Sequence, residues 1–222
     1  MKNRMVKVAV YPVRHKTGNQ NVHVPDLTLL KQRLNEIFAY QTNAWFDITI
    51  KNQAFFDYAG ESGSGYPDGY SLTSHTPKEF EMLQNAAFAD PAQDITVFLI
   101  DNINYYADGS LATGASYPPI LGQATALFNK CVVNVGWTGE PFTRPDEDIV
   151  HTIAHEIGHL VTGIGHPDLG GGFAKLQHLT LADHRKRLMC SGENSTLASK
   201  LLVKTEWDKA EEWLKAYTDM RN

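Results

Sequence analysis

Hydrophobic and polar residues alternate over two stretches near the N-terminus, which is typical of half-buried β-strands. Residues 6–13 (VKVAVYPV) alternate and are rich in β-branched side chains, and residues 47–56 (DITIKNQAFF) alternate as well. Between them, residues 25–46 carry apolar side chains at helical spacing, at Leu27, Leu30, Leu34, Ile37 and Phe38. The pattern predicts a strand, a helix and a second strand.

The middle of the chain predicts further strands. Residues 57–76 form a Gly- and Ser-rich loop of a length that tends to be functional, and residues 77–89 fit a short helix. Residues 94–101 (DITVFLID) form a continuous apolar run, which is typical of a strand buried on both faces. Residues 123–128 and 131–135 flank a short polar turn and predict a hairpin.

The C-terminal part predicts helices. One is expected to start within residues 143–146, with Thr143 as its capping residue and proline and acidic residues in its first turn, and to end at Gly163. Its apolar face consists of Ile149, Ile153, Ile157 and Leu160. A weaker helix is expected within residues 175–187, and a final helix over residues 204–217 presents Trp207, Ala210, Trp213 and Leu214 on one side. This order of elements indicates an α/β fold, a mixed sheet covered by helices.

Composition narrows the classes of protein that fit. The 222 residues are 42% hydrophobic, which suits a single domain over residues 1–222. The net charge is -5 and no basic cluster stands out, so a nucleic-acid partner is not expected. Apolar runs such as residues 95–100 are far shorter than the ~20 residues of a membrane span. We expect no membrane span, and we favour a monomer.

The termini and cysteines leave two questions open. The first residues lack the apolar run and cleavage site of a signal peptide. We expect either an extracytoplasmic protein without its leader or a cytoplasmic one. Cys131 and Cys190 are the only cysteines, so a disulfide framework is excluded, and either two buried thiols or one bridge would fit.

The candidate chemistry lies in residues 155–159, which read His-Glu-Ile-Gly-His. His155 and His159, four residues apart on a helix, project from one face and can chelate one zinc ion. Glu156 would lie beside the metal without ligating it, and could accept a proton from a zinc-activated water. The alternative is a helix with incidental histidines, but the strong helix-start signals and the apolar opposite face argue against it.

A catalytic zinc ion normally takes three protein ligands and leaves one position open. Gly163 can adopt a positive φ and turn the chain back towards the metal, and Gly165 adds conformational freedom. His166 follows these glycines and is the favoured third ligand. Asp168 and Glu193 are the alternative oxygen ligands.

Residues 155–166 (HEIGHLVTGIGH) resemble the HExxHxxGxxH signature of the metzincin metalloproteases, with one residue inserted before the glycine. Residues 187–192 (RLMCSG) look like the methionine turn of that family, which would set Met189 beneath the zinc histidines. A lone methionine is otherwise more often core filler. Some members use a tyrosine two residues after this methionine, where this chain has Ser191.

The resemblance extends to the order of elements over most of the chain. It implies a mixed twisted sheet of about five strands with an antiparallel edge strand, an active-site helix and a C-terminal helix. The edge strand would be residues 123–128, along which an extended peptide substrate would lie. The catalytic domain would have an upper part over about residues 1–163 and a lower part over about residues 164–222.

The sequence therefore predicts a zinc-dependent metallopeptidase, with an endopeptidase implied by the resemblance. Zinc would be held by His155, His159 and His166, and Glu156 would be the general base. One alternative is a zinc peptidase of another clan with an oxygen third ligand. The other is a zinc-stabilised, metzincin-like binding module without proteolysis.

Three of the six other histidines lie near this part of the chain and have ligand chemistry but no motif. His151 lies one helical turn before His155, and we expect it to pack or to form a hydrogen bond near the site rather than bind metal. His178 and His184 are expected at the surface.

Overall fold

The computed structural model describes residues 4–15, 22–56, 92–100, 122–125, 129–137, 140–163, 165–166, 183, 185–191 and 196–219. The expected helix over residues 77–89, the loop before it and most of the expected helix over residues 175–187 lie outside these ranges. No helix in the described part of the chain combines the length and apolarity that crossing a membrane requires.

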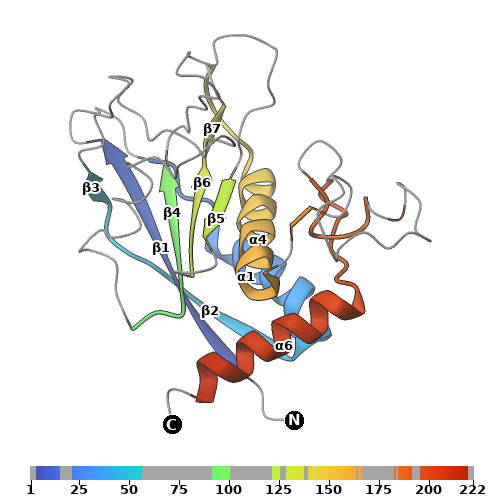
Figure 1. The fold of residues 1–222 in the computed structure, drawn as a ribbon. Coiled ribbons are helices and arrows are strands. Elements are labelled where there is room, and N and C mark those ends of the chain that lie inside the picture. Colours follow the sequence, from blue (N-terminus) through green and yellow to red (C-terminus); the bar gives the residue numbers. More distant parts are fainter. Residues whose placement is uncertain are drawn as a thin grey trace, which may run out of the picture.

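The main sheet has parallel strands at its centre (Figure 1). Its strand order is β2-β1-β4-β6-β5, and β3 also pairs with β1. The strands are β1 (Arg4–His15), β2 (Ala44–Ile50), β3 (Ala54–Phe56), β4 (Ile95–Ile100), β5 (Gly122–Thr125) and β6 (Lys130–Asn134). Strands β2, β1, β4 and β6 are mutually parallel, whereas β5 runs antiparallel to β6. All six residues of β4 are buried, as the apolar run predicted.

The expected second strand is two strands. β2 pairs with the first half of β1, and β3 pairs with its last three residues. Because β1 is 12 residues long and β2 only 7, one short strand cannot cover its whole edge. The strand is interrupted at residues 51–53, and the chain then pairs with β1 again through β3.

The first helix ends earlier than its apolar pattern predicted. It consists of α1 (Leu27–Leu34), the π-helical turn η1 (Asn35–Ala39) and α2 (Tyr40–Thr42). Asn43 then adopts a left-handed conformation with φ 58°, which asparagine tolerates better than most residues. Phe46, which the pattern included in the helix, belongs instead to β2.

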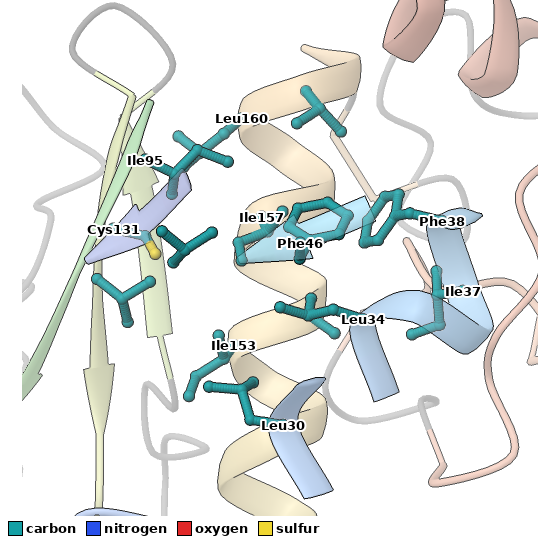
Figure 2. Close-up of a cluster of buried hydrophobic side chains, with 14 of the residues drawn as sticks. Leu30, Leu34, Ile37, Phe38, Phe46, Ile95, Cys131, Ile153, Ile157 and Leu160 are labelled. Atoms are coloured by element: carbon teal, nitrogen blue, oxygen red, sulfur yellow. The ribbon is translucent and has the colours of Figure 1, made fainter. Parts of the chain in front are cut away.

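Helix α4 (Asp146–Thr162) is buried along almost its whole length. In Figure 2, its side chains Ile153 and Ile157 lie between Cys131 of the sheet and Leu34 of α1. The contact with several elements at once explains why residues on more than one face of α4 are inaccessible to water. Cys131 and Cys190 are both free, buried thiols, which decides the question that the sequence left open.

The start of α4 differs from the prediction. Thr143 ends β8 (Glu140–Thr143), which pairs with β7 (Gly136–Trp137), and Pro145 is the N-cap without a side-chain bond. The side chain of Arg144 anchors the start of α4 by hydrogen bonds instead. Its buried guanidinium donates to the Asn134 carbonyl oxygen at 2.5 Å and to Thr152 Oγ1 at 2.6 Å. The helix start is therefore tied to the end of β6.

The final helix α6 (Lys204–Asp219) crosses below α4 in Figure 1 and packs against it. Ala210 and Leu214 are buried as expected, but Trp207 is 38% exposed.

A buried ion pair lies at the start of α6. The Glu206 carboxylate pairs with Arg187 and accepts a hydrogen bond from the Val203 amide at 2.8 Å. This pair joins α6 to the segment Arg187–Ser191.

Replacing Glu206 with alanine should destabilise the fold by about 3–5 kcal/mol, because the Arg187 charge would stay buried without its carboxylate partner. Asp208→Ala is the matched control, since it removes the exposed pair with Lys204 on the same helix. That loss should stay below about 0.5 kcal/mol. Urea unfolding measures both, and equal losses would contradict the role given to the buried pair.

Candidate metal centre

Three imidazole rings converge at the end of α4. The Nε2 atoms of His155, His159 and His166 lie 3.0, 3.1 and 3.2 Å from one another in pairs. They form a nearly equilateral triangle of nitrogen atoms and make up a cluster able to hold a metal ion. The structure therefore brings together the three histidines that the sequence singled out.

The local backbone explains how His166 reaches the other two. The four-residue spacing sets His155 and His159 one turn apart on the same face of α4. Gly163 ends the helix with φ 63°, and its amide donates to the His159 carbonyl oxygen at 2.9 Å. The left-handed residue reverses the chain, and His166 returns to the helix three residues later.

The triangle suits a small cation. Zinc binds imidazole nitrogens at about 2.0–2.1 Å in tetrahedral geometry, which separates neighbouring nitrogens by roughly 3.3 Å. The observed separations of 3.0–3.2 Å are close to that value. Three unprotonated nitrogens would repel one another at this distance, whereas a bound cation would stabilise all three.

The hydrogen bond of His155 selects the tautomer that metal binding needs. Its Nδ1 lies 2.7 Å from the carbonyl oxygen of Leu188, which can only accept. Nδ1 therefore carries the proton and Nε2 keeps its lone pair free. Burial, with the neighbouring His159, holds the pKa of His155 well below its ordinary value and keeps the ring neutral.

Met189 packs directly against the turn of α4 between the two helical histidines. A Cβ atom added to Gly158 would lie 2.4 Å from the Met189 sulfur and 3.2 Å from Leu188 Cδ2. Met189 is fully buried. Only glycine at position 158 lets the methionine approach this closely, so the glycine inside HEIGH has a packing reason.

The Glu156 side chain is 5% exposed and points away from solvent. Burial raises its pKa to about 8. The carboxylate lies against β5, since a Cβ on Gly122 would be 2.7 Å from Glu156 Oε1. A buried carboxyl group with a perturbed pKa beside a metal-binding cluster is a candidate for acid–base chemistry.

His151 belongs to a separate hydrogen-bond network. Its Nδ1 lies 2.7 Å from Arg33 Nη2, and the same guanidinium nitrogen donates to the Leu197 carbonyl oxygen at 2.6 Å. Burial and then the charge of Arg33 lower the pKa of His151 to about 4. His151 is thus a neutral acceptor that joins α4 to α1, in line with the hydrogen-bonding role expected of it.

The alternative oxygen ligands Asp168 and Glu193, together with His178 and His184, lie outside the described residues. Sequence reasoning missed two contributors to the site, Gly122 and the Leu188 carbonyl group, and it also missed Arg33, the partner of the nearby His151. A glycine at the start of an expected strand is a recognisable sign of close approach. Nothing in the sequence pairs Arg33 with His151, 118 residues away.

Comparisons with known proteins give structural neighbours only. The sequence matches no family model and no curated protein. Among solved structures, archaemetzincin from Methanopyrus kandleri is 15% identical with a TM-score of 0.48, covering 96% of both chains. A zinc-dependent peptidase from Methanocorpusculum labreanum is 12% identical with a TM-score of 0.46, covering 91% of this chain and 99% of that one. Archaemetzincin from Archaeoglobus fulgidus, complexed with malonate, is 14% identical with a TM-score of 0.43, covering 92% and 99%.

Replacing His155, His159 or His166 with alanine should weaken metal binding strongly, because each removes one corner of the nitrogen triangle. The loss should exceed the roughly 10- to 100-fold typical of residues that only hydrogen-bond to a ligand. His151→Gln is the control and should leave the affinity nearly unchanged, because His151 is hydrogen-bonded to Arg33 rather than to one of the three histidines. Zinc titration against a chromophoric chelator measures all four. Unchanged affinity in His166→Ala would point to another third ligand.

Stability should fall on acidification partly through His151. Its folded-state pKa of about 4 lies below its ordinary value of 6.5. Between these values the unfolded chain takes up a proton that the folded chain excludes, so stability is lost as the pH falls. At pH 5 the loss is on the order of 2 kcal/mol.

His151→Gln keeps an acceptor for Arg33 and removes this titration. In metal-free buffer, the variant should lose less stability than the wild type between pH 7.5 and pH 5, as measured by urea unfolding. Parallel pH curves for the two proteins would show that His151 is not the titrating group.

Proposed function

We propose that this chain is a zinc-dependent metallopeptidase that binds zinc through His155, His159 and His166 and uses Glu156 as general base. The observation that carries the proposal is the triangle of three Nε2 atoms at 3.0–3.2 Å, with a buried carboxyl residue next to His155 on the same helix. Few structural roles would require a buried acid and three converging imidazoles in one place.

The donor set favours zinc in a catalytic role. Imidazole nitrogen is a common zinc ligand, and structural zinc sites usually have four protein ligands. Within the described part of the chain, the cluster contains three donors. Three ligands leave a coordination position for water or substrate, which is the arrangement of catalytic sites.

Glu156 has the properties of a proton carrier. When bound, zinc would supply Lewis acidity, activating a water molecule and polarising the peptide carbonyl. The Glu156 carboxylate would accept the proton of the attacking water and pass it to the nitrogen of the leaving amine. Burial disfavours the charged carboxylate, but a cation held by the neighbouring histidines favours it, so the group can work in either protonation state near neutral pH.

Two further features support a metzincin-type endopeptidase. Residues 155–166 follow HExxHxxxGxxH, and Met189 is buried against the helix turn between His155 and His159. β5 ends the strand order in the described sheet and is antiparallel to β6. An extended peptide could add to such an edge by main-chain hydrogen bonds, which requires no free terminus.

The test combines metal content with cleavage. Protein purified without added metal should contain about one zinc ion per chain, consistent with one three-histidine site. It should cleave denatured casein or a peptide library, and a chelator should abolish the cleavage. Glu156→Gln, which keeps the shape of the side chain but cannot accept the proton, should lower kcat by roughly 10²- to 10⁴-fold and retain zinc.

The control variant His151→Gln should retain both zinc and cleavage. Bound zinc without chelator-sensitive cleavage across the library would contradict the peptidase, and would favour a zinc-stabilised binding module. Absence of zinc after reconstitution would contradict the metal site itself.

A further inference from the structure

Strand β5 and the Glu156 side chain are in unusually close contact at Gly122. A Cβ atom built on Gly122 would lie 2.7 Å from Oε1, 2.8 Å from Cγ and 2.9 Å from Cδ of Glu156. Real Cβ atoms essentially never come within 3.0 Å of a heavy atom in this way. A glycine inside a strand often marks such a close approach.

The register of the sheet shows which face of β5 is involved. Gly122 pairs with Val133 and Ala124 with Cys131, and all four positions belong to the face that packs towards α4. Ala124 directs a methyl group to this face and packs against the core. Gly122, two residues earlier on the same face, has no side chain to direct there. On this face of β5, the described residue without a methyl group is therefore the one that lies against Glu156.

The carboxylate has little room to move elsewhere. Glu156 is 5% exposed, and the fully buried Cys131 of β6 lies near enough for the carboxylate charge to contribute to the raised pKa of its thiol, after burial. The side chain thus projects from helix α4 into a region bordered by β5 and β6. A displaced carboxylate would have to push one of these elements or leave the orientation it holds now.

We propose that Gly122 is a positioning residue: its missing side chain lets strand β5 hold the Glu156 carboxylate in place. β5 would then serve both as the edge for substrate and as the wall that aligns the base. The inference rests on the proposed function for its catalytic consequence, but the contact itself does not depend on any activity.

The distances of this contact indicate how much kcat Gly122→Ala should lose. Ordinary van der Waals contact begins at 3.4 Å, so a methyl group 2.7 Å from Oε1 requires a shift of about 0.7 Å (3.4 − 2.7) to reach ordinary contact. A displacement of about 1 Å in a catalytic group can cost on the order of 10²-fold in rate. Gly122→Ala should therefore lower kcat by roughly 10- to 100-fold.

The first experiment measures thermal stability in a double-mutant cycle, without any assay of activity. Gly122→Ala should lower Tm by about 2–10 °C when Glu156 is present. In the Glu156→Ala background the same substitution should leave Tm unchanged or slightly higher, because the clashing carboxylate is gone. Gly165→Ala is the matched control, since its Cβ would meet no atom within 4 Å and Tm should not fall.

The second experiment measures kcat, KM and zinc content. Gly122→Ala should lower kcat with KM and zinc content little changed, because neither the histidines nor the bulk of the strand is altered.

Equal Tm losses with and without the Glu156 side chain would overturn the inference, and so would a kcat of Gly122→Ala equal to that of the wild type. These outcomes differ from failure of the proposed function. If the wild type binds no zinc or cleaves no peptide, the proposed function fails, while the stability cycle still decides whether Gly122 and Glu156 are sterically coupled.

Discussion

The contact between α4 and the segment Arg187–Ser191 is the constraint on which the metal centre depends. Met189 packs against Gly158, and the Leu188 carbonyl oxygen accepts the Nδ1 proton of His155. The first interaction sets how closely the segment can approach the helix, and the second orients the imidazole and selects its tautomer. Moving this segment away would leave His155 buried without an acceptor, an arrangement that costs free energy as well as metal affinity.

This segment is itself held from outside the centre. Arg187 pairs with Glu206 at the start of α6, and the Leu188 amide donates to the Leu201 carbonyl oxygen at 2.9 Å. Residues 196–203 are in turn bonded to the first helical segment, where Arg33 donates to Leu197 and Gln41 contacts both Lys200 and Leu202. The orientation of one histidine therefore depends on contacts that span almost the whole chain.

The Glu156 side chain is positioned by a different part of the structure, the sheet. Glu156 lies on the sheet side of α4, where β5 approaches so closely that a single methyl group on Gly122 would collide with it. The histidines and the carboxylate are thus held by separate partners, the Arg187–Ser191 segment and the sheet, although they are neighbours on one helix. Such a division lets each group be fixed by its own contacts.

The sequence by itself determined β1, β4, α4 and α6 and the convergence of His155, His159 and His166, because these follow from local periodicity, four-residue spacing and a helix-ending glycine. It misjudged the end of the first helix and the cap of α4, since Asn43 and Arg144 act through backbone conformation and a contact with β6. Only the tertiary structure decided the tautomer of His155, the partner of His151 and the wall beside Glu156. Each of these depends on residues tens of positions apart, whose approach is set by packing and leaves no periodic signal in the chain.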